Sequence, residues 1–218
     1  HGRQYNPPAT YRPVVTDDRE RWNEKYNTDE AFELPDDPIP ELARRIDTLP
    51  TGRALDVATG TGRNARFLAA EGYDVDAVDV SDEALDQARR AAAETGVDVN
   101  WIRADIDDFE FEPDAYDVIT VSFFAMLDRI PDLTAALAPG GVLVYEHHLR
   151  SSDDIDIGPS SDRFRYPANH LLHACLDLTI LHYEERTRPD EKGRTQAVAT
   201  LVGRQSEGGA QSYPRLAE

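Results

Sequence analysis

The stretch of sequence that decides the fold is Ala54–Asn64, which reads ALDVATGTGRN. Its first part is apolar apart from one acid, Asp56, and predicts a short strand over Arg53–Ala58. Glycines then form a turn, and Arg63–Glu71 has the apolar spacing of a helix. Such a turn lets a ligand approach the backbone closely, and the first turn of the following helix offers it free N–H groups. The stretch therefore predicts a ligand site between a strand and a helix.

Strands and helices alternate on both sides of this stretch. Further helices are predicted at Asp17–Tyr26, Glu41–Leu49, Asp82–Thr95 and Pro131–Leu137, and further strands at Asp74–Asp79, Val99–Arg103, Tyr116–Ser122 and Val142–Glu146. This alternation indicates a parallel sheet with right-handed crossovers. The ending differs, because Asp177–Glu185 and Thr195–Gly203 are rich in β-branched residues and flank a polar turn. We expect an α/β fold with a doubly wound, mostly parallel seven-stranded sheet and a C-terminal antiparallel hairpin.

The charge balance disfavours one class of partner and predicts an unusual environment. The chain of 218 residues carries 42 acidic and 23 basic side chains, a formal net charge of -19. This charge repels nucleic-acid phosphates and no basic stripe counters it, so we expect no nucleic-acid partner. Acidic residues throughout the chain, with lysine only at Lys25 and Lys192, resemble the proteins of salt-loving microbes. At ~1 M salt a Debye length of ~3 Å would screen the repulsion. An ordinary acidic protein is the alternative.

Length and composition predict one cytoplasmic domain. No apolar run reaches the ~20 residues that span a bilayer, so we expect no membrane partner. The lone cysteine, Cys175, permits no intrachain disulfide. We predict a helical cap segment over residues 1–50, a ligand-binding domain over residues 51–204 and a tail over residues 205–218. The sequence gives no sign of an oligomeric state.

The second predicted strand ends in Asp79, about twenty residues beyond the glycine turn, where a carboxylate can hold the hydroxyls of a ribose. This order of elements indicates an adenosine-type ligand. Two chemistries fit it. Gly60–Ala65 satisfies the dinucleotide pattern of a nicotinamide-dependent oxidoreductase. Methyl transfer from S-adenosylmethionine fits better, because Asp56 inside the first strand suits a cationic cofactor and the closing hairpin is unlike a dehydrogenase.

From Arg21 onward the sequence resembles the class I S-adenosylmethionine-dependent methyltransferases. The family's first motif matches Asp56, Ala58, Gly60 and Gly62, with Ala58 in place of its first glycine. Later matches are Asp105 after the third strand, Tyr116-Asp117-Val118-Ile119 at the fourth, and Pro139-Gly140-Gly141 before the fifth.

Within this class the chain is most similar to the tellurite-resistance and thiopurine-methyltransferase-like branch of small-molecule enzymes. The stretches behind this closer resemblance are Arg21-Trp22-Asn23-Glu24-Lys25-Tyr26, Gly62-Arg63-Asn64, Val144-Tyr145-Glu146 and Leu181-His182-Tyr183-Glu184-Glu185. The branch's usual cysteine before the glycine motif is Thr59 here.

The resemblance implies a Rossmann-like fold, S-adenosyl-L-methionine as cofactor and a small-molecule methyl acceptor, with residues 51–204 as the methyltransferase domain. The implied cofactor-binding residues are Asp56, Ala58, Thr59, Gly60, Gly62, Asn64, Asp79, Val80, Ala104, Asp105, Ile106 and Ser122. Three of these have simpler alternatives. In these alternatives, Asp56 is a structural acid bonded to turn amides, Asp79 is a cap for the next helix, and Asp105 is only a surface charge.

The sequence says less about which residues bind the methyl acceptor than about those that bind the cofactor. An acceptor with a proton to lose needs a base, and His147 after the fifth strand is the candidate, with a surface or hydrogen-bonded histidine as the alternative. The candidate acceptor-contacting residues are Trp22, Tyr26, Phe123, His148, Arg150, Arg163, Arg165 and His170. Trp22 and Tyr26 either cover the cofactor or pack their helix onto the sheet. The arginines either hold an anionic acceptor or offset the charge of nearby aspartates. No histidine or cysteine spacing indicates a metal site. A non-catalytic binder of adenosyl compounds is a further alternative.

Overall fold

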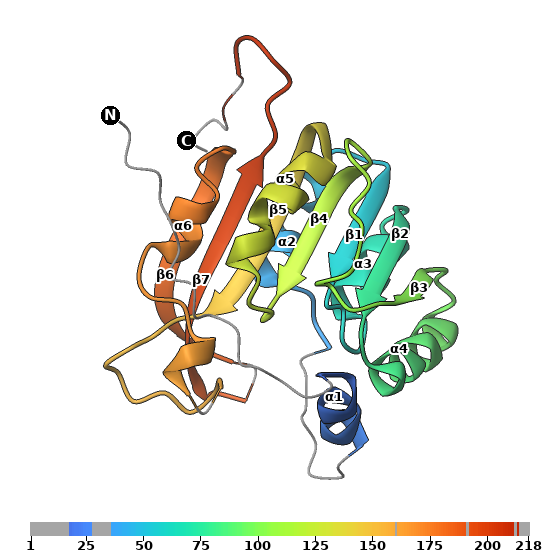
Figure 1. Cartoon of the computed structure of the whole chain (residues 1–218), viewed down its shortest axis with the longest axis vertical. Helices are drawn as coiled ribbons and strands as arrows, with labels where there is room; N and C mark the ends of the chain where they lie inside the picture. Colours follow the sequence, from blue (N-terminus) through green and yellow to red (C-terminus); the bar gives the residue numbers. More distant parts are fainter. Residues whose placement is uncertain (1–17, 28–35, 160, 191, 212, 214–218) are drawn as a thin grey trace.

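A seven-stranded sheet in the order β3-β2-β1-β4-β5-β7-β6 runs through the computed structural model of the chain (Figure 1). The structure describes residues 18–27, 36–159, 161–190, 192–211 and 213. The strands are β1 (Arg53–Val57), β2 (Asp74–Asp79), β3 (Asn100–Arg103), β4 (Tyr116–Ser122), β5 (Leu137–His148), β6 (Thr179–Pro189) and β7 (Thr195–Arg204). Neighbours among β1 to β5 pair in parallel, and β7 pairs antiparallel with β5 and β6. The predicted sheet and its terminal hairpin are confirmed.

Helices cover both faces of this sheet (Figure 1). They are α1 (Asp18–Asn27), α2 (Pro40–Arg45), α3 (Arg63–Ala70), α4 (Asp82–Thr95), α5 (Ile130–Ala136) and α6 (His170–Ala174), with short 3-10 turns η1 (Ile46–Thr48), η2 (Leu127–Arg129) and η3 (Asp162–Phe164). Successive residues of a strand point to opposite faces, so β5 sends Val142 and Val144 into one apolar cluster and Leu143 and Tyr145 into the other. Burial on both faces explains why the central strands are apolar throughout.

Several predicted boundaries shift in the structure, and three differences affect whole elements. The helix predicted over Glu41–Leu49 is α2 followed by the 3-10 turn η1. Strand β5 runs to His148 because β7 continues to pair with it there, opposite Val198. Helix α6 was not predicted, since a helix of five residues has almost no intrinsic stability and depends on tertiary packing. The N-terminal cap and the C-terminal tail lie partly outside the described residues, and the domain boundaries stay predictions.

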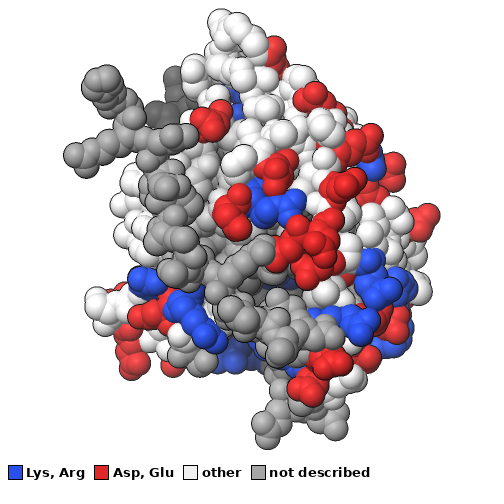
Figure 2. All heavy atoms as spheres, in the orientation of Figure 1, with Lys and Arg blue, Asp and Glu red and all other residues white. Residues whose placement is uncertain are grey.

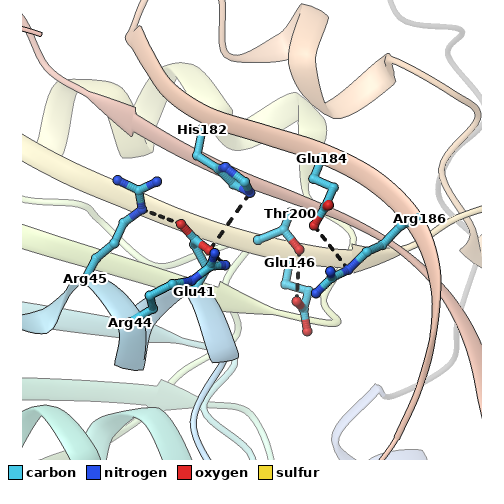
Figure 3. A network of polar contacts seen from close by, with 8 residues as sticks. All are labelled: Glu41, Arg44, Arg45, Glu146, His182, Glu184, Arg186 and Thr200. Atoms are coloured by element: carbon cyan, nitrogen blue, oxygen red, sulfur yellow. Dashed lines mark hydrogen bonds and ion pairs between the residues drawn. The ribbon is translucent and has the colours of Figure 1, made fainter. Parts of the chain in front are cut away.

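Buried acids join distant elements. Glu41 of α2 is 2% exposed, pairs with Arg44 and Arg45 and lies 3.9 Å from His182 Nε2 on β6 (Figure 3). Glu146 of β5 is fully buried, accepts a hydrogen bond of 3.0 Å from the Thr200 hydroxyl on β7 (Figure 3) and forms a 2.7 Å ion pair with a β6 arginine. Because removing one member of a buried pair strands a charge, these contacts fix how the terminal hairpin meets the sheet.

The surface carries acidic and basic groups side by side, with acidic side chains spread over much of the visible face (Figure 2). Within the described residues, no helix is long and apolar enough to cross a membrane.

Candidate functional site

A pocket lies at the carboxyl ends of the central parallel strands and is lined in part by helix α1. Figure 1 shows α1 near these strand ends. It encloses about 930 Å³, its open mouth included. The residues that line it are Trp22, Tyr26, Ala58, Thr59, Gly60, Thr61, Arg63, Asn64, Asp79, Val80, Asp105, Ile106, Asp107, Ser122, Phe123 and Phe124. Strand β1 lies between β2 and β4, so the pocket is at the point where the strand order reverses. Doubly wound sheets bind their ligands there.

The turn after β1 is left-handed at three positions. Ala58, Gly60 and Gly62 have φ angles of 53°, 56° and 78°. Gly62 does not line the pocket, and a Cβ on it would lie 2.6 Å from the ring of Trp101. Its glycine is therefore required by the turn and by close packing, and its predicted contact with the cofactor stays a prediction.

Asp79 binds the glycine turn from the end of β2. Its Oδ2 accepts a 2.8 Å hydrogen bond from the Gly60 N–H, and its Oδ1 accepts one of 2.9 Å from the Ser81 N–H. Burial raises the pKa of Asp79, while these N–H donors lower it. Ser81, not Asp79, caps helix α4 through its side chain. A carboxylate has about four lone-pair positions, so Asp79 keeps the capacity to accept from a ligand hydroxyl.

Asp56 lies beneath the pocket rather than in its wall. It accepts hydrogen bonds from the hydroxyls of Thr59 and Thr120, at 2.5 and 2.6 Å, and from the amide of Asn64 at 3.4 Å. Burial is the main reason that its pKa is raised. Its predicted direct contact with the cofactor stays a prediction. The alternative of a buried structural acid agrees with these bonds, although its partners are side chains rather than turn amides.

Arg63 is a pocket residue that was missing from the predicted site. It is 8% exposed, with Nη2 2.7 Å from the Ser122 hydroxyl and Nη1 3.0 Å from the Asp37 carbonyl oxygen. It begins helix α3, where the helix dipole disfavours a cation. An arginine at this unfavourable position could have been noticed in the sequence, because a cation at the start of a helix suggests that it binds an anionic group.

The end of β3 supplies the opposite side of the pocket. Asp105 and Ile106 line it, as predicted, together with Asp107. Ala104 does not line it; its N–H instead donates a 3.0 Å hydrogen bond to the Asp79 carbonyl oxygen, which joins the ends of β2 and β3.

The loop after β4 is strained and firmly held. Phe123 lines the pocket with a φ of 55°, a conformation that is costly for a bulky residue. Its N–H donates to the Glu146 carbonyl oxygen at 2.8 Å. Two buried hydroxyls hold the next residues: Tyr145 donates to the Phe124 carbonyl oxygen, and Tyr166 accepts from the Met126 N–H at 3.0 Å.

Helix α1 packs beside the pocket, against α4 rather than the sheet. Trp22 and Tyr26 both line the pocket, with ring centroids 6.2 Å apart. The Tyr26 carbonyl oxygen accepts from Gln87, and Asn23 accepts from the Ser81 hydroxyl at 2.7 Å.

His147 is not placed as a base for the pocket. It is 2% exposed, its ring lies 4.1 Å from that of Tyr166, and its Nε2 is 3.1 Å from the Phe164 carbonyl oxygen. Burial lowers its pKa to about 3. The structure therefore does not support the predicted catalytic role.

Four predicted acceptor-contacting residues do not line the pocket, namely Arg150, Arg163, Arg165 and His170. Arg150 and Arg163 are exposed, and Arg163 covers the ring of Phe164. Arg165 binds the Pro159 carbonyl oxygen, and His170 begins helix α6. His148 differs from these residues, because its ring stacks on Phe123 at 4.3 Å.

Comparison with known proteins identifies the domain. Residues 54–141 match the family described as "Methyltransferase domain". That range includes the glycine turn, Asp79, Asp105 and Phe123. Residues 54–141 belong to a methyltransferase domain. Over 101 residues it is 38% identical to the ubiquinone biosynthesis O-methyltransferase of Vibrio atlanticus (strain LGP32), covering 43% of this chain and 42% of that protein. The chain thus matches less than half the length of this curated relative.

Solved structures agree on the fold. TehB from Haemophilus influenzae has a TM-score of 0.67 at 19% identity, over 86% of this chain and 67% of that one. The [4+2]-cyclase SpnF has a TM-score of 0.62 at 21% identity, over 77% of this chain and 79% of that one. The reaction of the methyltransferase domain must therefore be argued from its pocket.

The pocket of the methyltransferase domain fits S-adenosylmethionine. Arg63 offers a cation at the glycine turn, where the carboxylate of the methionyl part would bind. Asp79 offers lone pairs for the ribose hydroxyls, and the β3 end with Ile106 offers an apolar surface for the adenine. Within the described residues, no three His, Cys, Asp or Glu side chains are placed to hold a metal ion.

Proposed function

We propose that this protein transfers a methyl group from S-adenosyl-L-methionine to a small-molecule acceptor. The observation that carries the proposal is the match of residues 54–141 to a methyltransferase domain, because that range supplies most of the walls of the pocket.

We assign separate roles to the residues that hold the cofactor. Arg63 pairs with its carboxylate, and Asp79 accepts from its ribose. The backbone of Gly60 and Thr61 lines the pocket at the turn, and Gly60 adds no side-chain bulk there. Asp56 acts indirectly, since it fixes Thr59 and Asn64 on either side of the turn. When bound, the cofactor supplies an activated methyl group, so the protein has to align the acceptor with it and exclude water.

The acceptor side of the proposal rests on the aromatic wall. Trp22 and Tyr26 from α1 and Phe123 from the β4 loop line the same pocket, and we place the acceptor among them. A cytoplasmic location and a salt-loving source stay predictions from composition.

Binding calorimetry tests the cofactor. We expect S-adenosylhomocysteine to bind in molar salt and a nicotinamide dinucleotide not to bind. Replacing Asp79 by alanine should weaken S-adenosylhomocysteine strongly, by about tenfold or more, because a hydrogen bond to a charged group is lost. Asp82→Ala is the matched control, since this exposed acid begins α4 outside the pocket. Binding of the dinucleotide alone would overturn the proposal.

A further inference from the structure

One arginine binds the segment that forms a wall of the pocket. Arg129, the last residue of η2, donates from Nη1 to the carbonyl oxygens of Ile106 and Asp107, at 2.5 and 2.8 Å. Its Nη2 donates to the carbonyl oxygen of Phe109 at 3.0 Å, and its guanidinium lies over the ring of Phe111, 5.1 Å from the centroid. Four residues of one segment thus contact a single side chain, and two of them, Ile106 and Asp107, line the pocket.

The segment that Arg129 binds has no helix or strand of its own. Residues 104–115 join β3 to β4 through turns and irregular backbone, so their carbonyl oxygens lie outside any helix or strand ladder. Hydrogen bonds from a charged donor are about twice as strong as neutral ones, and a planar guanidinium presents five donors in a fixed arrangement. Its Nε pairs with Asp132 on α5 at 2.5 Å, and the side chain is only 18% exposed. Arg129 is therefore well placed to determine the shape of this segment.

Arg129 also belongs to the loop that forms the neighbouring wall. Its backbone N–H donates a 2.9 Å hydrogen bond to the Met126 carbonyl oxygen, and the Met126 N–H donates to the Tyr166 hydroxyl at 3.0 Å. Phe123 and Phe124, which line the pocket, lie at the start of the same loop. Arg129 thus connects the segment after β3 to the loop after β4, and both of them line the pocket.

The wall that Arg129 binds is acidic. Asp105 and Asp107 line it, whereas Arg63 at the glycine turn is the one arginine or lysine among the described lining residues. Asp105 Oδ1 accepts a 3.0 Å hydrogen bond from the Asp107 N–H, and a carboxylate has about four lone-pair positions, so Asp105 keeps the capacity to accept from a ligand. Such a wall favours a base that carries an amino group, because a carboxylate accepts hydrogen bonds and donates none.

We propose that Arg129 is a positioning residue that holds residues 105–107 in the shape that recognises the amino group of adenine. The inference rests on the proposed binding of S-adenosylmethionine. Arg129 does not line the pocket, so it acts through the carbonyl oxygens that it binds and not through contact with the ligand. Without the guanidinium, ligand binding would itself have to order this wall, which lowers affinity and blurs the choice of base.

Competition with S-adenosylhomocysteine in calorimetry tests the proposal on the full chain. The probes are adenosine and purine riboside, which is adenosine without its amino group. We expect the unmodified protein to bind adenosine about tenfold or more tightly, the range of a hydrogen bond to a charged group. Arg129→Met should reduce this ratio to about threefold or less, because the wall is no longer ordered before binding. A purely structural role would leave the ratio unchanged, since both probes bind the same folded protein.

Three further variants assign the ratio to Arg129. Arg103→Met is the matched control, since Arg103 ends β3, is 53% exposed, pairs with Asp82 at 3.2 Å and does not line the pocket. It should keep the full ratio. Arg63→Met should weaken S-adenosylhomocysteine and also keep the ratio. Arg129→Lys retains the cation without the planar fork, so its ratio should lie between those of the unmodified protein and Arg129→Met.

The proposal is overturned if the unmodified protein does not prefer adenosine, if Arg129→Met keeps the preference, or if Arg103→Met loses it equally. If the methionine variant does not fold, Arg129→Lys decides, and an unchanged ratio in that variant overturns the proposal. Failure of S-adenosylhomocysteine to bind the unmodified chain would instead refute the proposed function.

Discussion

Replacing Arg63 by methionine tests which part of the cofactor this residue holds. Methionine keeps much of the length of the side chain and removes the guanidinium, which contacts Ser122 and the Asp37 carbonyl oxygen and is 8% exposed. A hydrogen-bonded charge at such a site contributes about 1.5–3 kcal/mol to binding. At 1.4 kcal/mol per factor of ten, the affinity for S-adenosylhomocysteine should fall by about 10- to 150-fold.

A second ligand isolates the effect. 5′-Methylthioadenosine lacks the amino-acid part of S-adenosylhomocysteine, so its affinity should change little in Arg63→Met. Stability should fall somewhat, because the two lost hydrogen bonds outweigh the about 0.3–1 kcal/mol gained by removing a cation from the start of α3, so folding of the variant is checked before each titration. Calorimetric titrations of both ligands measure the difference.

The matched control is Arg66→Met. Arg66 lies one turn further along α3, pairs with exposed Asp36 at 3.2 Å and does not line the pocket. It should leave both affinities unchanged. If Arg63→Met weakens the two ligands equally, Arg63 only maintains the pocket and the assigned carboxylate contact is refuted.

Three further predictions concern stability. Ala58→Gly should raise the free energy of unfolding by about 0.5–1 kcal/mol in chemical denaturation, because relief of a left-handed alanine, about 1–2 kcal/mol, exceeds the entropy that glycine adds to the unfolded chain; a destabilised variant would contradict this. Burial raises the pKa of Asp56 above its unfolded value, so the folded state takes up its proton first, and stability gained through this group should rise as pH falls through the raised pKa. Relative to Asp56→Asn, the wild type should therefore gain stability as pH falls from neutral toward 4, and a difference independent of pH would refute the cause. Finally, the net charge of -19 predicts that circular dichroism shows weaker folding in millimolar than in molar salt, and complete folding in millimolar salt without ligand would count against salt adaptation.

The sequence allowed the sheet, the glycine turn and the position of Asp79 beside it to be predicted, because these depend on local patterns. The glycine turn and Asp79 are defined by spacing along adjacent elements. Alternating apolar segments determined the strands, and the polar turn before Thr195 determined the hairpin.

The other features of the site could not be predicted, because they depend on contacts between residues that are distant in the sequence. Asp56 is satisfied by Thr120, 64 positions away, so no local pattern could show that it supports the turn from below. Tyr145 and Tyr166 meet only in the folded chain, where their hydroxyls lie 2.7 Å apart and hold the pocket loop. His147 looked suitable because it follows a strand in the expected place, but the alternation of β5 directs it into the core.

Transfer of a labelled methyl group tests the central claim most directly. The protein would be incubated in molar salt with S-adenosylmethionine labelled at the methyl carbon and a panel of organic carboxylates and phenols, with neutral analogues beside them. We predict that label enters an acceptor with the unmodified protein and is strongly reduced with Asp79→Ala. A protein that binds neither S-adenosylmethionine nor S-adenosylhomocysteine, and transfers no label to any acceptor, would contradict the account.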